Sequence, residues 1–187
     1  MQLITQRRTA SGFSLIEALI TMVVVGVGLL GLAKIQAAAV GNTQISRVRS
    51  LVALQTESLI AAMHANRGFW GVANTAPATF SVSAKTATDS NKVFATTIAG
   101  CPKSGGAACT PTELAAYDIQ QWAVQMDANF PGYTATGNCT TDTTLPASCN
   151  VTVTWNEKTI AVNSATASAA AAGQPSTQQS YTVYVQP

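Results

Sequence analysis

The sequence predicts an α+β protein in which one long N-terminal helix packs on a small antiparallel sheet, with a second helix further along. Three observations support this. An apolar run of 21 residues, from Phe13 to Ala33, carries a single charge, Glu17. A second helical pattern begins near Thr110, and short alternating stretches occur towards the C-terminus. The length of 187 residues fits one domain and one membrane helix.

The apolar run has the length of a membrane span. At about 1.5 Å per helical residue it covers about 30 Å, the thickness of the hydrocarbon core of a bilayer. A spanning segment must satisfy its backbone internally, so the run is predicted to be helical. We therefore expect a leader at 1–12, a membrane-spanning and assembly helix at 13–34, and a globular domain at 35–187 that includes the second half of the helix.

The helix is predicted to continue beyond the membrane, because no proline precedes Pro77. Arg67-Gly68 provides a stop, and His64 is expected to be a surface residue near the helix end rather than a ligand. One apolar face recurs at helical spacing in this second half. Its members are Ile45, Val48, Val52, Leu59 and Met63.

The second helix has a strong start signal. Thr110 can cap it, Pro111 suits its first turn, and Glu113 can bond back to the cap. A helix of about 15–18 residues should follow and end at Phe130-Pro131-Gly132. Its apolar face is expected to contain Leu114, Ile119 or Tyr117, Trp122 and Met126.

Strand signals are weaker. Short strands are expected at Phe80–Val82 and Val93–Phe94, with loop between them. Residues 150–155 alternate apolar and polar side chains and predict a half-buried strand. A turn at 156–158 should lead to residues 159–162, a mobile loop should occupy 164–179, and a final strand should run from Tyr181 to Val185.

Four cysteines form two close pairs in the sequence, Cys101 with Cys109 and Cys139 with Cys149. Neither pair has the C-x-x-C spacing of a zinc or redox site. In a chain that crosses a membrane, two disulfides in an oxidising compartment are expected. Because both gaps are short, we predict pairing within each pair. The glycines between Cys101 and Cys109 then belong to a tied turn rather than to a phosphate cradle.

Composition excludes several classes of function. The formal charge is +2, and Arg7 and Arg8 of the leader supply both charges, leaving 8 basic and 8 acidic groups beyond it. This balance provides no electrostatic footprint for nucleic acid. The sequence lacks a G-x-S-x-G elbow and has one histidine. We therefore predict no catalytic, cofactor-binding or metal-binding residues, and no enzyme activity.

The junction Gly12-Phe13-Ser14-Leu15-Ile16-Glu17 resembles the prepilin-peptidase site of type IV pilins and type II secretion pseudopilins, with Ser14 where the family more often has Thr. The resemblance implies the pilin fold. It also implies cleavage between Gly12 and Phe13, N-methylation of Phe13, and a role for Glu17 as the charge that guides assembly. The enzyme that carries out both the cleavage and the methylation would be the prepilin peptidase, which is also an N-methyltransferase.

Three other interpretations of the N-terminus exist. A secretory signal would use Arg7 and Arg8 as its basic region and residues 37–39 as its cleavage site, and Arg7-Arg8 could alternatively belong to a twin-arginine signal. An ordinary membrane anchor would explain the helix. The twin-arginine interpretation rests on a dipeptide alone. Glu17 weakens the other two, since a carboxylate in a membrane helix costs about 2.5–3.5 kcal/mol on insertion scales and usually has a role.

A second resemblance involves residues 112–118, Trp122, Pro131-Gly132 and residues 151–155, which look like the PilV group of minor pilins, the type IV pilus modification proteins. It implies a minor pilin that helps to initiate type IV pilus assembly near the pilus tip. The implied partners are other minor and major pilins, the inner-membrane assembly platform and a pilus-tip adhesin. The protein would lie in the bacterial inner membrane, with a periplasmic domain, before it enters the pilus. The alternative is a minor pseudopilin of a type II secretion system.

Overall fold

The computed structural model describes Gly12, residues 14–158 and residues 176–187. Its helices are α1 (Leu15–Ala65), α2 (Arg67–Trp70) and α3 (Pro111–Asn129). Its strands are β1 (Thr79–Ser83), β2 (Thr86–Asp89), β3 (Thr134–Cys139), β4 (Cys149–Lys158) and β5 (Ser176–Val185). The strands form one antiparallel sheet in the order β2-β1-β3-β4-β5. The predicted α+β class, with a long helix, a small sheet and a second helix, is confirmed.

Contacts divide the chain into two units, Met1–Thr43 and Gln44–Pro187, which are described separately. In the second unit, α1 has the predicted buried face: Val52 and Met63 are fully buried and Leu59 nearly so. His64 is exposed, as expected. The buried face of α1 also includes Thr56. Its hydroxyl donates to the carbonyl of Val52 at 2.8 Å, so this buried donor has a hydrogen-bond partner inside the core.

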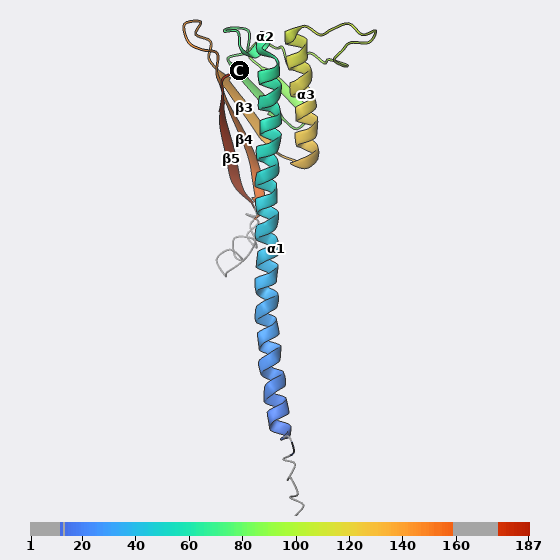
Figure 1. Ribbon diagram of the computed structural model, residues 1–187, viewed down its shortest axis with the longest axis vertical. Coiled ribbons are helices and arrows are strands. Elements are labelled where there is room, and N and C mark those ends of the chain that lie inside the picture. Colours follow the sequence, from blue (N-terminus) through green and yellow to red (C-terminus); the bar gives the residue numbers. More distant parts are fainter. Residues whose placement is uncertain (1–11, 13, 159–175) are drawn as a thin grey trace, which may run out of the picture. The chain divides into compact units, whose positions relative to one another are not determined.

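Helix α3 starts as predicted, with a capping box between Thr110 and Glu113 and a proline in its first turn. It lies alongside the last turns of α1 (Figure 1), and two hydrogen bonds fix this arrangement. The Asn66 amide donates to the carbonyl of Pro111 at 2.7 Å, and the Trp122 indole donates to the carbonyl of Gln55 at 2.7 Å. The end of one helix therefore meets the start of the other, so the two are antiparallel.

Strand β3 was not predicted, because its buried positions are small. Its core-facing residues are Ala135 and Gly137, and Gly137 pairs directly with Phe80 of β1. The Phe80 ring fills the space above that glycine, because a Cβ added there would overlap its edge carbons. Phe80 also belongs to an aromatic cluster in the core. The other members are Phe69, Trp70 and Phe94.

The strand predicted at Val93–Phe94 is wrong: these residues lie in a turn, and β2 forms earlier, in a stretch that was expected to be loop. The cause is Asp89, at the end of β2. Its carboxylate accepts hydrogen bonds from the backbone N–H groups of Asn91, Val93 and Phe94 at 2.6–3.1 Å. A side chain that binds three backbone donors of the following turn bends the chain where an apolar pair alone indicated a strand.

The turn predicted at 156–158 is also wrong, since β4 continues through these residues and pairs with β5 as far as Lys158. Strand β5 likewise begins at Ser176, inside the stretch expected to be loop. Residues 159–162, to which the turn was expected to lead, and the rest of the expected loop up to 175 lie outside the described residues. Residues 156–158 are polar, yet they remain extended because Glu157 is buried and paired with Arg49 of α1.

Candidate functional site

The first turn of α1 is built on the carbonyl of Ser14. This oxygen accepts the backbone N–H of Glu17 at 3.0 Å and that of Ala18 at 3.2 Å, so the helix begins at Leu15. Gly12 is exposed, and an added Cβ would meet nothing within 4 Å. Phe13 and residues 1–11 lie outside the described part of the chain. Cleavage after Gly12 and methylation of Phe13 therefore remain predictions.

Glu17 occupies the first turn of α1 and is exposed. It is the one charged residue among the described positions that precede Lys34. A carboxylate in this turn is favoured by the exposed N–H groups of the helix start. Within lipid, however, a carboxylate without a counter-charge is costly. The role of Glu17 as an assembly charge therefore remains a prediction.

The surface around Glu17 is apolar and uncovered. Every large apolar side chain from Leu15 to Leu32 is more than half exposed. Among the described residues, α1 is the one helix that is long and apolar enough to cross a membrane. An added Cβ on Gly26, Gly28 or Gly31 would also meet nothing within 4 Å. These side chains require an apolar environment, such as lipid or neighbouring helices.

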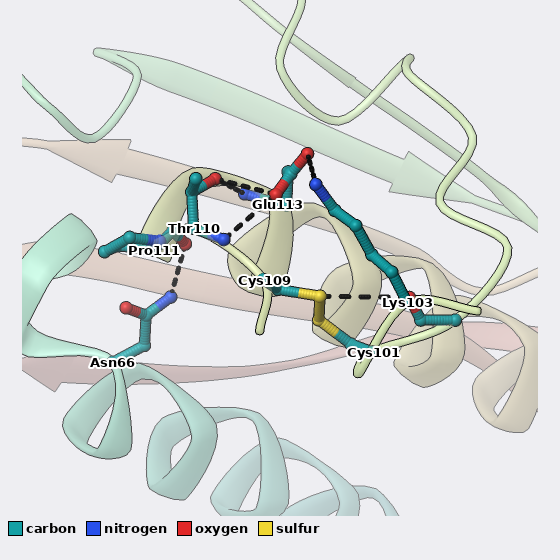
Figure 2. The surroundings of a disulfide bond; sticks show 8 residues. Asn66, Cys101, Lys103, Cys109, Thr110, Pro111 and Glu113 are labelled. Carbon is teal, nitrogen blue, oxygen red and sulfur yellow. Dashed lines mark hydrogen bonds and ion pairs between the residues drawn. A yellow bond between two sulfur atoms is a disulfide. The ribbon is translucent and has the colours of Figure 1, made fainter. Parts of the chain in front are cut away.

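The structure links Cys101 to Cys109, the pairing expected from their spacing. Figure 2 shows that this loop is attached to the start of α3 by an ion pair as well as by the disulfide. The ammonium of Lys103 lies 2.8 Å from the carboxylate of Glu113, which also caps the helix through Thr110. The Lys103 hydrogen bond and the Thr110 bonds lower the pKa of Glu113 to about 2. Glu113 therefore holds both the loop, through Lys103, and the start of α3, through Thr110.

The second disulfide joins Cys139 to Cys149, which are directly opposed residues of β3 and β4. It closes the base of the connection between these strands. Two further contacts continue this closure: the backbone N–H of Thr140 donates to the carbonyl of Ser148 at 2.8 Å, and their hydroxyls also meet at 2.8 Å. Both disulfides therefore stabilise loops of the domain.

Sequence reasoning missed one charged cluster. Arg49 binds both carboxylate oxygens of Glu157 at 2.8 Å, and the Trp155 indole donates to the same carboxylate at 3.1 Å. The Arg49 hydrogen bond holds the pKa of Glu157 below its usual range, and Glu157 in turn raises the pKa of Arg49. One signal was available: Val151, Val153 and Trp155 alternate onto the buried face, and Glu157 continues that alternation.

The described residues contain no group of three or more His, Cys, Asp or Glu side chains that could hold a metal ion. All four cysteines are bonded in the two disulfides. The features that stand out are the exposed apolar segment of α1 from Leu15 to Ala33 and the carboxylate of Glu17 within it, and such a segment is suited to a membrane.

Comparison with protein families agrees with this interpretation. Residues 7–33 match the family model described as the prokaryotic N-terminal methylation motif. Comparison with curated proteins and with solved structures finds no match. The motif implies processing by a prepilin peptidase and anchoring in the inner membrane before assembly into a pilus-like fibre, and it indicates a structural subunit rather than an enzyme. The chain therefore carries an N-terminal motif of the kind found in type IV pilins and pseudopilins, together with an α+β domain of pilin-like architecture.

Proposed function

We propose that this protein is a minor pilin that helps to initiate type IV pilus assembly and enters the pilus near its tip. The observation that carries the proposal is the methylation motif at residues 7–33, which leads into an apolar helix whose side chains are uncovered. A minor rather than a major subunit is favoured because α1 contains no proline, whereas major pilins often carry one along this helix. The similarity of residues 112–118 and 151–155 to the PilV group also supports this assignment.

In this proposal, cleavage after Gly12 creates a positive amine on Phe13, and methylation keeps it positive. Glu17 lies four residues further on, which is about 6 Å of helix rise. When subunits are staggered along a fibre, the carboxylate of one can meet the amine of another. Because lipid hardly screens charge, each unpaired group is costly, and the pair favours one register between subunits.

The proposed partners follow from this step. They are the prepilin peptidase, the inner-membrane assembly platform, and the major and minor pilins whose apolar helices pack against α1. A pilus-tip adhesin is a further proposed partner. The globular domain would be periplasmic until the subunit leaves the membrane.

Two experiments test the proposal. Deletion of the gene should abolish or greatly reduce surface pili and leave type II secretion intact. Normal pili with defective secretion would overturn the proposal in favour of a pseudopilin. The second experiment uses Glu17→Gln, with Glu57→Gln as its control.

Glu17→Gln removes the charge with little change of volume. Glu57 is an exposed glutamate of the same helix, outside the apolar run. We expect Glu17→Gln to be cleaved and inserted normally but to be lost from sheared pili on an immunoblot, while Glu57→Gln is incorporated. Equal incorporation of both variants would show that assembly does not need the Glu17 charge.

A further inference from the structure

The solvent face of the sheet carries two complete rows of hydroxyl side chains. The register aligns one outward residue from each of the five strands in each row, and all ten are Ser or Thr. One row contains Thr86, Ser83, Thr134, Thr154 and Ser180, and the other contains Thr88, Ser81, Thr136, Thr152 and Thr182. Solvent faces usually mix such residues with charged ones, so an uncharged hydroxyl surface of this size is unusual.

A hollow lies over the part of this face formed by β2, β1 and β3. It measures about 560 Å³, which is within the range of small-molecule sites. Its outward side chains include Thr79, Ser81, Thr88, Thr136 and Asn138. Hydroxyls both donate and accept, and the Asn138 amide adds a paired donor and acceptor. The hollow therefore offers many hydrogen bonds of both kinds within a small area.

The charge of the hollow restricts its ligand. Among the described residues, its lining contains no lysine, arginine or histidine that would attract phosphate or carboxylate. Its one carboxylate, Asp89, already accepts three backbone N–H groups. Its one large apolar residue, Phe80, is only 3% exposed, so an apolar ligand would find little to contact. A neutral ligand rich in hydroxyl groups is the class that fits.

The two hydroxyl rows continue beyond the hollow, across the sheet to β5. Neighbouring strands lie about 4.8 Å apart and outward residues of one strand about 6.7 Å apart, so the hydroxyls form a regular grid. Some are already oriented by one another, as in the 2.9 Å contact between the hydroxyls of Thr152 and Thr182. In the next row, the exposed ring of Tyr184 lies opposite Asn150 and offers an aromatic face for a sugar ring.

From the hollow, the uncharged rows and the exposed tyrosine together, we propose that this face of the sheet binds a neutral oligosaccharide or polysaccharide. One or two sugar rings occupy the hollow over β1 and β3. The following rings lie along the hydroxyl rows towards β5. This binding is independent of the assembly role, because none of these residues belongs to the apolar helix.

The test uses the full-length chain in a polyoxyethylene detergent, whose head group is not a sugar. Mobility is measured in native gels that contain dextran, soluble starch, laminarin or galactomannan, and co-sedimentation is measured with cellulose and chitin. We expect retention by at least one of these. Thr136→Val removes one hydroxyl without changing strand preference and should weaken that binding roughly threefold to tenfold, the effect of one neutral hydrogen bond.

Thr136→Lys, which places a bulky charge at the edge of the hollow, should abolish binding. Ser58→Lys adds the same charge at an exposed site on α1 and should bind as the original chain does. Tryptophan fluorescence checks that all variants are folded. The proposal is overturned if none of the six polysaccharides is bound, or if both Thr136 variants bind normally. It is also overturned if the chain binds no polysaccharide but slows the growth of ice crystals, since the grid would then match ordered water.

Discussion

Gly137→Ala is expected to be the most damaging single-methyl change in the sheet. Gly137 lies opposite Phe80, and the added Cβ would overlap Cε1 and Cζ of that ring and lie 2.6 Å from its Cδ1. The ring cannot move aside without cost, because its centre lies 5.7 Å from that of Phe94 and 5.9 Å from that of Trp70. Either the cluster or the pairing of β1 with β3 must shift.

The structure sets the size of the effect. Overpacking a well-filled core costs about 1–3 kcal/mol, and losing a buried phenylalanine altogether costs about 3–5 kcal/mol. Since the ring is 3% exposed and enclosed by other aromatics, we expect a loss between these cases, about 2–4 kcal/mol of unfolding free energy. This is a large share of the 5–15 kcal/mol that is typical of a domain.

Urea unfolding of the full chain in mild detergent, followed by tryptophan fluorescence, measures this loss, because Trp70 contacts Phe80. Gly100→Ala is the matched control: the nearest atom to its Cβ would be the carbonyl oxygen of Pro102 at 3.5 Å, an ordinary contact, so stability should change by less than about 0.5 kcal/mol. In the double variant, Phe80→Leu should recover part of the loss. If Gly137→Ala is as stable as the control, or if the two changes are simply additive, the overlap argument fails.

Three further predictions concern processing, the core and pH. The mature chain should begin at Phe13 by mass spectrometry, and Gly12→Glu should remain an uncut membrane precursor; a start near residue 40 would indicate a secretory signal instead. Val52→Asp should unfold the domain, since this side chain is fully buried in the core, and a native fluorescence spectrum would contradict that. The pKa of Glu113 is lowered from 4.5 to about 2, chiefly by Lys103, so its stabilising effect is present above pH 4.5 and is lost as the pH falls towards 2. Acid unfolding of Glu113→Gln should therefore show a weaker pH dependence in that range, and an unchanged profile would exclude this role.

The two long helices could be predicted because their signals are local. The cap at Thr110 and the apolar periodicity through Val52 and Met63 depend only on residues within a few turns of each other. The methylation motif is local in the same way, and the family match covers the segment where the sequence analysis located it. The position of the Glu17 charge within the apolar run could therefore be identified from the sequence alone.

The sheet was predicted less well, because what fixes it is distant in sequence. Strand β3 has no bulky apolar alternation of its own, since Phe80 from another strand fills the space above Gly137. The end of β4 looked like a turn because the partner that permits Glu157 to be buried is Arg49, 108 residues earlier. The hydroxyl rows likewise exist only when the register aligns outward residues from five strands.

The pairing of Arg49 with Glu157 also has a consequence for the order of events during synthesis. A ribosome adds about 5–20 residues per second, so the 108 residues between them take roughly 5–22 s to make. For most of that interval the apolar stripe of α1 has been translated but its sheet is incomplete, because β4 and β5 come last. The nascent chain must therefore be protected at this stripe before the domain closes, and a delay in completing β4 would lengthen the period in which the new chain is vulnerable to proteases and to aggregation.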